Sequence, residues 1–212
     1  MLRAAVQVMA ESGYHHAQIS RIARAAGVAD GTVYLYFKNK EDILVSLLRR
    51  SIQKIVATLQ DALRSIDDAA EKLQFLVHLY LRELGADPEL AMVTQVHMRQ
   101  VDAGIRRAIG DFMKPFYSVL DEIVEAGVRQ GVFHEPMDRR VARRMIFGTM
   151  DETVTAWVLS GSKYDLYAQA DAVVDVLLHG LCGKPVDCQS AHSGKQERGV
   201  PGEHHRVFEA DV

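Results

Sequence analysis

Apolar residues recur at helical spacing along most of this chain. Between Ile19 and Ala26 they fall three or four residues apart, which is the stripe of a short amphipathic helix. From Glu41 to about Gly183 nearly every segment keeps this period, and no alternating pattern is long enough for a strand. The pattern predicts an all-α fold, with helices beyond the first forty residues at 40–64, 68–84, 88–100, 102–130, 138–160 and 165–182.

Residues that begin and end helices stand between the periodic segments. Aspartate before a helix accepts hydrogen bonds from its free N–H groups, and proline fits the first helical position. Glycine after a helix enters the left-handed region without strain. Pro115 is expected to bend or divide the 102–130 helix. The expected caps are Asp87 (followed by Pro88), Asp102 and Asp138, and the expected ends are Gly85, Gly131 and Gly161.

A helix-turn-helix is predicted near the N-terminus. Gly27 is expected to end the first short helix, and Asp30 to cap a second one. Val33 and Phe37 have the spacing to pack back on the first helix. Two short helices joined by a glycine turn are typical of this DNA-binding motif.

The same segment resembles the DNA-binding signature of the tetracycline-repressor-like (TetR) regulators. A plain helical bundle with an aromatic core explains Tyr34 and Phe37, but not the accompanying Thr32, Tyr36 and Lys40. In such regulators the first helix usually begins farther upstream with basic residues, so either this chain starts inside a longer gene product or it makes fewer phosphate contacts. The resemblance covers roughly the first fifty residues and is carried by Gly27, Gly31, Thr32, Tyr34, Phe37 and Lys40, with Glu11-Ser12-Gly13-Tyr14 and Glu41-Asp42-Ile43-Leu44 on either side.

The polar residues of this segment have chemical roles in DNA binding. The hydroxyls of Thr32 and Tyr36 are expected to donate to phosphate oxygens, and Lys40 to attract phosphate from the first turn of a helix capped by Asn39. Small residues and a tyrosine at the start of the second helix suit close approach to base edges. For Val33, packing in the core is an alternative to DNA contact, and for Phe37 packing in the core is favoured. Gln18 is equally well explained as a surface residue. The predicted DNA-contacting residues are Gln18, Ala29, Gly31, Thr32, Val33, Tyr34, Tyr36 and Lys40.

Charge and composition divide the chain. Residues 1–51 carry a net charge of +3, whereas the whole chain carries −3, so a basic head precedes an acidic body. We expect a DNA-binding domain at 1–46, a helical effector-binding and dimerisation domain at 47–183, and a disordered tail at 184–212 with few large apolar residues. The tail histidines, His192, His204 and His205, are more typical of an unliganded tail than of a metal site.

Several other classes of protein are disfavoured. No apolar run approaches the roughly twenty residues of a membrane span, and no signal peptide is visible, so we expect a soluble cytoplasmic protein without a membrane partner. Cys182 and Cys188 lack the number and spacing of a disulfide framework or a zinc site. No nucleophile elbow, P-loop or paired metal-ligand motif is present, and His78 and His97 suit packing, so we expect no enzyme, catalytic residue, metal or cofactor.

Three segments, at 90–100, 112–117 and 145–157, are more apolar than a surface helix needs. They could line a cavity for an apolar ligand, although an ordinary core explains any single Met or Phe among them better. The predicted ligand-binding residues are Met92, Gln95, Arg99, Phe112, Phe116, Phe147, Met150 and Trp157. The basic groups available to an anionic ligand are Arg99, Arg106, Arg107 and the cluster Arg139, Arg140, Arg143 and Arg144, which a solvated helix face explains equally well.

Residues 30–44, 91–95, 99–100 and 145–158 resemble the fatty-acid-degradation (FadR) regulators of the TetR superfamily. The resemblance implies a repressor of β-oxidation genes that long-chain acyl-CoA releases from its operator. It also implies an acyl chain buried among the helices and a nucleotide near the surface. Two alternatives stay open: a TetR-type repressor of an efflux or stress operon with another apolar ligand, and a helical ligand-binding protein without DNA function.

The last two predicted helices combine an apolar face with small residues. In TetR-like proteins such helices pair with their two-fold mates in a four-helix bundle, and an inverted-repeat operator needs two recognition helices at a fixed separation. We therefore expect a homodimer on a double-stranded inverted-repeat operator, with Val174 and Leu177 in the dimer interface. The alternative is that these helices only cover the core of their own protomer.

Overall fold

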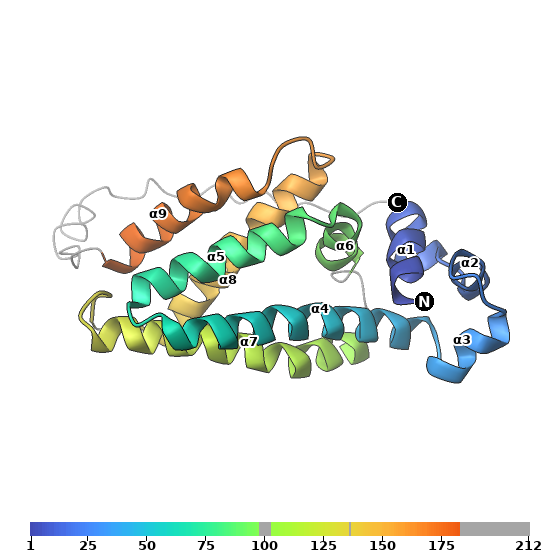
Figure 1. Cartoon of the computed structure of the whole chain (residues 1–212), viewed down its shortest axis with the longest axis horizontal. Coiled ribbons are helices and arrows are strands. Elements are labelled where there is room, and N and C mark those ends of the chain that lie inside the picture. The colour runs from blue at the N-terminus through green and yellow to red at the C-terminus, as the bar shows by residue number, and fades with distance from the viewer. Residues whose placement is uncertain (98–102, 136, 183–212) are drawn as a thin grey trace, which may run out of the picture.

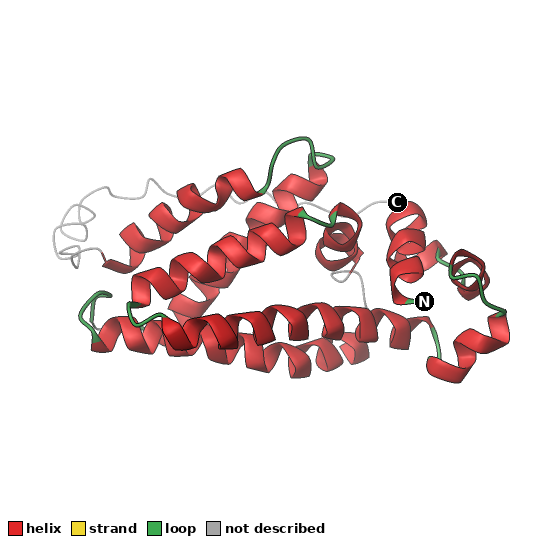
Figure 2. Cartoon of the chain, viewed as in Figure 1, coloured by secondary structure: helices red, strands yellow, loops and turns green. Residues whose placement is uncertain are grey.

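The computed structural model describes residues 1–97, 103–135 and 137–182, and the regular structure within these ranges is helical (Figure 2). Figure 1 shows a small head at one end of an elongated body. The head contains α1 (Leu2–His16), α2 (Ile19–Ala25) and α3 (Asp30–Tyr36). None of the described helices is both long and apolar enough to cross a membrane.

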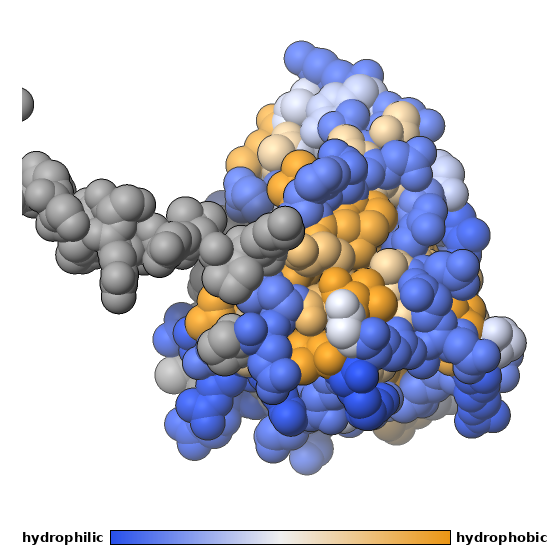
Figure 3. Space-filling model, turned by 90° about the vertical axis from the view of Figure 1, so that its left-hand side faces the viewer, coloured by the Kyte–Doolittle hydropathy of each residue, from blue (hydrophilic) through white to orange (hydrophobic). Residues whose placement is uncertain are grey.

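The body begins with α4 (Lys40–Ala62), which starts at the head and lies alongside α7 (Figure 1). α5 and α8 pack on this pair and on each other, α9 packs on α5 and α8, and α6 lies between these helices and α1. Viewed from the end opposite the head, hydrophobic residues gather in the middle of the body with hydrophilic residues around them (Figure 3). The remaining body elements are α5 (Ala69–Gly85), α6 (Pro88–Met92), the π-helical turn η2 (Val93–His97), α7 (Ala103–Arg129), α8 (Arg139–Leu159) and α9 (Ala170–Cys182), with short 3₁₀ turns η1 (Leu63–Ser65) and η4 (Tyr167–Gln169).

The periodic segments form helices close to the predicted ranges, with three differences. The segment predicted as one helix at 88–100 is, up to His97, the short α6 followed by the wider turn η2, and its last three residues lie outside the described residues. The last helix begins at Ala170, after η4, rather than at 165. α7 runs unbroken through Pro115, so Pro115 does not divide this helix, and the alternative, a bend at Pro115, stays a prediction. Proline removes one backbone donor, and the remaining hydrogen bonds of a 27-residue helix hold it together.

Two of the predicted aspartate caps are confirmed. A side-chain oxygen of Asp87 accepts from the N–H of Leu90 at 3.0 Å. Asp138 accepts from the N–H groups of Arg140 and Val141 at 2.8 and 3.0 Å, and these bonds hold the pKa of its carboxyl below the ordinary value. The third expected cap, Asp102, lies outside the described residues.

The turn before α3 differs from the prediction at one residue. Gly27 ends its helix with φ of +68°, as expected, and Gly131 and Gly161 do the same with +69° and +79°. Asp30, however, does not cap α3: the extended residue Ala29 precedes the helix, and Asp30 is its first residue. Its carboxylate therefore stabilises α3 through the attraction between its negative charge and the positive end of the helix dipole, not through a capping hydrogen bond. Gly85 is the last residue of α5 and has no positive φ.

Head and body share apolar packing where they meet. Val93 of η2 and Ile105 of α7 are buried in the core of the head, against residues of α1 and α4. Phe112 of α7 packs against both the head core and the body core. A shift of η2 or of the start of α7 therefore changes contacts of the head.

Candidate nucleic-acid interface and effector cavity

The outer face of α3 carries three large exposed side chains. Tyr36 is 66% exposed, Leu35 is 81% exposed, and Tyr34 is also mostly accessible. Exposed aromatic and aliphatic groups on a short second helix suit contact with the edges and backbone of a DNA groove. Leu35 was missed in the sequence analysis because an apolar residue in a helical pattern is more often buried.

The other residues predicted to contact DNA divide into exposed and buried. Ala29 and Gly31 are exposed where α3 begins, Gln18 is exposed at the start of α2, and Thr32 is partly exposed. Val33 is fully buried in the head core, so its assignment to base edges is wrong. The core role that competed for Val33 applies, because the apolar side of so short a helix must face α2.

Lys40 has a structural role that the sequence did not predict. Its ammonium donates to the backbone carbonyl of His15 at 2.9 Å and lies 4.7 Å from the centre of the Tyr14 ring. The hydroxyl of Tyr14 in turn donates to Glu41 at 3.1 Å, and Asn39 caps α4 at 2.8 Å, as expected. These contacts fix the start of α4 against the end of α1, so the Lys40 charge is held at one place on the head.

An apolar cavity lies in the body between α4, α5, η2, α7 and α8. Its cavity volume is only about 40 Å³. Three of the predicted ligand residues, Gln95, Phe112 and Phe147, line it. Thr94, Met113 and Asp151, from the three predicted apolar segments, also line it, as does Leu84. The lining residues not expected from sequence are Leu48, Ser51, Ile52, Ile55 and Tyr80.

The other predicted ligand residues stand behind or away from the cavity wall. Phe116 is fully buried, with its ring centre 5.9 Å from that of Phe147, so it supports the aromatic wall. Met150 is buried in the body core, and Met92 packs on that core without lining the cavity. Trp157 donates from its indole nitrogen to the carbonyl of Tyr164 at 2.7 Å and holds the loop after α8. Arg99 lies outside the described residues.

Arg143 of the 139–144 cluster contacts the aromatic residues beside the cavity. It pairs with Asp121 at 2.7 Å, and its guanidinium lies 5.3 Å from the centre of the Tyr117 ring. The ring of Tyr117 contacts that of Phe147 edge to face at 5.6 Å. Burial and the Asp151 carboxylate raise the pKa of Tyr117, and the Arg143 charge partly opposes this shift. Arg139 pairs with Glu125, so two of the four arginines already have carboxylate partners.

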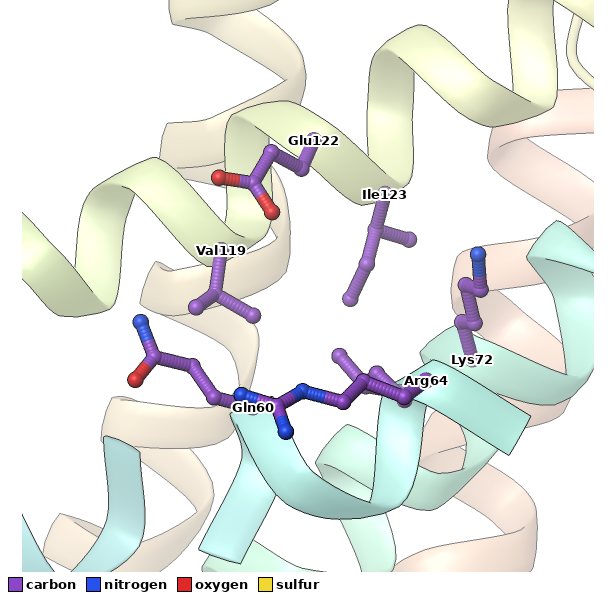
Figure 4. A pocket seen from close by; sticks show the side chains of 7 residues that line it. Gln60, Arg64, Lys72, Val119, Glu122 and Ile123 are labelled. Atoms are coloured by element: carbon purple, nitrogen blue, oxygen red, sulfur yellow. The ribbon is translucent and has the colours of Figure 1, made fainter. Parts of the chain in front are cut away.

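A second, open groove lies between η1, α5 and α7 (Figure 4). Arg64 of η1 and Lys72 of α5 lie on one side of it, and Val119, Glu122 and Ile123 of α7 lie on the other. None of the predicted ligand residues lines this groove. Its lining carries two cations, Arg64 and Lys72, and one carboxylate, Glu122.

Comparison with known proteins identifies the architecture. Residues 1–47 match the family of bacterial regulatory proteins named tetR, and residues 48–180 match the C-terminal region of YsiA-like proteins, so nearly all of the described chain is covered. The chain belongs to the TetR family. Within that family, α2 and α3 are its helix-turn-helix.

The similarity to individual TetR-family members extends through the body. The fatty acid metabolism regulator protein of Bacillus subtilis is 44% identical over 184 residues, which is 87% of this chain and 95% of that protein. The structure of the fatty acid degradation regulator FadR from Bacillus halodurans is 47% identical, covers 85% of this chain and 97% of its own, and has a TM-score of 0.81. FadR from Bacillus subtilis in complex with stearoyl-CoA is 44% identical with the same coverages and a TM-score of 0.82.

Proposed function

We propose that this chain is a homodimeric transcriptional repressor of fatty-acid-degradation genes, which leaves its operator when a long-chain acyl-CoA enters the body. Regulators of the TetR family are not enzymes, and the relatives reported above are regulators of fatty acid metabolism. One of them was crystallised with stearoyl-CoA, an amphiphile with a long apolar tail. The apolar cavity is the place in this chain that suits such a tail.

The observation that carries the proposal is the position of η2 between the cavity and the head. Val93 is fully buried in the head core, while the next two residues, Thr94 and Gln95, line the cavity. Three consecutive residues therefore contact both regions. A ligand that moves Thr94 and Gln95 must also change the packing of Val93 against the head.

The narrowness of the cavity explains how binding is linked to release. An acyl chain has to push the lining side chains apart, because the present cavity holds only about 40 Å³. Each methylene that leaves water contributes about 0.8 kcal/mol, so a long tail supplies several kcal/mol for this rearrangement. A ligand shifts a conformational equilibrium only by its differential affinity for the two states, and free CoA lacks the part that supplies it.

A homodimer fits the outer faces of α8 and α9. Val141 and Leu159 of α8 and Val176 of α9 are exposed apolar side chains. α8 and α9 approach closely where Gly180 of α9 faces Met145 of α8. A Cβ atom placed on Gly180 would lie 3.5 Å from the Met145 side chain. A second copy of the chain placed on this face would hold two heads at a fixed distance, as an inverted-repeat operator requires.

Val174 and Leu177 do not belong to this outer face. Both are buried in the core of their own protomer, where α9 packs on α5. Assigning them to the dimer interface is therefore wrong, because the hydrophobic face of α9 is used within the chain. The exposed Val176 takes their place in the proposal.

Two binding experiments test the proposed function. Selection from a pool of random duplexes is expected to enrich an inverted repeat bound by two chains. Calorimetric titration of the DNA-free protein with stearoyl-CoA is expected to give one site per chain, and free CoA no measurable binding. Failure to enrich any duplex would remove the DNA-binding part, and equal heats from free CoA and stearoyl-CoA would remove the acyl-chain part.

A further inference from the structure

Arg3 joins the head to the body through two carboxylates. Its Nη1 lies 2.6 Å from an oxygen of Asp87, and its Nη2 lies 2.6 Å from an oxygen of Glu89. Arg3 is in the first turn of α1, whereas its partners are more than eighty residues away at the start of α6. A planar guanidinium that bonds two separate carboxylates fixes the orientation of α6 relative to α1 as well as the distance between them.

Asp87 uses its two oxygens for different purposes. Oδ1 accepts from the N–H of Leu90 and caps α6 at 3.0 Å, while Oδ2 accepts from Arg3. The residue that begins α6 is therefore also the residue that attaches α6 to α1. The first turn of α6 is held against the head at a defined position.

The segment from Asp87 to Gln95 connects this attachment to the cavity. α6 continues directly into η2, where Val93 enters the head core and Thr94 and Gln95 line the cavity. One end of a nine-residue segment thus carries the Arg3 contacts, and the other end forms part of the cavity wall. The contacts of Arg3 with Asp87 and Glu89 therefore oppose displacement of the cavity wall at Thr94 and Gln95.

We propose that Arg3 is a positioning residue that holds α6 in the operator-binding arrangement and thereby opposes entry of the acyl chain. This inference rests on the proposed function. It adds the residue that sets how sensitive the protein is to acyl-CoA. Some interactions within a protein are stronger before a ligand enters than after the ligand has entered. Such an interaction reduces the free energy of ligand binding by the difference between its two strengths, so the apparent affinity falls. Removing Arg3 therefore makes acyl-CoA bind more tightly.

The expected effect is modest. The Arg3 side chain is 63% exposed, and both carboxylates are partly exposed, so water screens the two ion pairs. We expect Arg3→Gln to lower the dissociation constant for stearoyl-CoA about two- to five-fold. Arg3→Lys keeps the charge but not the two-pronged geometry, and it should fall between the wild type and Arg3→Gln.

The test measures stearoyl-CoA binding to the DNA-free protein. This readout separates the proposal from a direct contact of Arg3 with a DNA phosphate, since such a contact has no influence when DNA is absent. The matched control is Arg21→Gln, which removes an equal charge and an ion pair with Glu11 that lies wholly within the head. In a Glu89→Gln background, the effect of Arg3→Gln should become smaller, because one of its two partners is already neutral.

The possible outcomes are distinct. Tighter binding by Arg3→Gln and by Glu89→Gln, with Arg21→Gln unchanged, supports the proposal. Equal affinity in wild type and Arg3→Gln overturns it and leaves the proposed function intact. No binding of stearoyl-CoA by the wild type overturns the proposed function and this inference with it. If Arg3→Gln does not fold, Glu89→Gln alone decides, because it breaks one of the two contacts from the side of α6.

Discussion

The hydroxyl oxygen of Thr155 on α8 lies 3.1 Å from the side-chain oxygen of Gln95 on η2 and 2.8 Å from the backbone carbonyl oxygen of Asp151, and its single proton is shared between these two acceptors. Both side chains are buried, with Gln95 2% and Thr155 6% exposed. The contact between Thr155 and Gln95 ties the turn that packs against the head to α8, which contributes Phe147 and Asp151 to the cavity wall. Gln95 was predicted as a ligand residue from sequence, and the structure adds the partner that holds it in place.

Thr155→Val should destabilise the protein by about 1–3 kcal/mol, because it removes the hydroxyl that the buried Gln95 amide oxygen and the Asp151 carbonyl share, while conserving volume. Urea unfolding followed by circular dichroism measures this loss. Thr155→Ser is the matched control, since it keeps the hydroxyl and should cost less. Unchanged stability of Thr155→Val would show that Gln95 is satisfied without Thr155.

Tyr36→Phe should weaken operator binding without lowering the melting temperature, because Tyr36 is 66% exposed and only its hydroxyl is removed. Fluorescence anisotropy with a labelled operator gives the affinity. Tyr164→Phe removes a tyrosine hydroxyl in the loop after α8 and should bind DNA as the wild type does. Equal affinities for all three proteins would place the Tyr36 hydroxyl away from the phosphates.

Lys40→Ala should reduce the slope of log affinity against log salt by about one, as expected when one phosphate contact is lost. A small loss of thermal stability should accompany it, because the ammonium also bonds the carbonyl of His15. Lys54→Ala removes a charge farther along α4, where Lys54 pairs with Glu83 in the body, and should leave the slope unchanged. A wild-type slope in Lys40→Ala would restrict Lys40 to its structural role.

Val176→Glu should yield folded monomers, because Val176 is 65% exposed on the proposed dimer face. Leu177→Glu, one residue further, should instead unfold the chain, since a charge would enter the body core. Sedimentation and far-UV circular dichroism distinguish the two results. A dimeric Val176→Glu protein would move the dimer interface elsewhere.

Most of the fold could be predicted from sequence, because helical periodicity and end residues are local signals. The glycine at 27 and the aspartates at 87 and 138 act on the neighbouring backbone, so their roles follow from position alone. The break between α6 and η2 depends on how that segment packs against both head and body, which no local pattern records. Asp30 was misplaced by one residue for a similar reason, since Ala29 adopts the extended backbone that a cap requires.

The candidate site could be predicted only in part. The apolar segments at 90–100, 112–117 and 145–157 did contribute cavity residues, but periodicity does not separate a cavity wall from the core behind it. Phe147 lines the cavity, whereas Phe116 supports it from the next layer. The contribution of α4 through Leu48, Ile52 and Ile55 was missed because its apolar stripe looks like that of any packed helix. The attachment of α6 through Arg3 joins residues too distant in sequence for any spacing rule.

The central claim is that acyl-chain length controls release from DNA. It is tested most directly by titrating the protein–operator complex with acyl-CoA from two to eighteen carbons, with free CoA as the matched control, and following the anisotropy of the labelled operator. The proposed mechanism predicts no release by free CoA or acetyl-CoA, and a half-release concentration that falls as the chain lengthens, because each buried methylene adds to the differential affinity. Equal release by acetyl-CoA and stearoyl-CoA, or none by either, would contradict it.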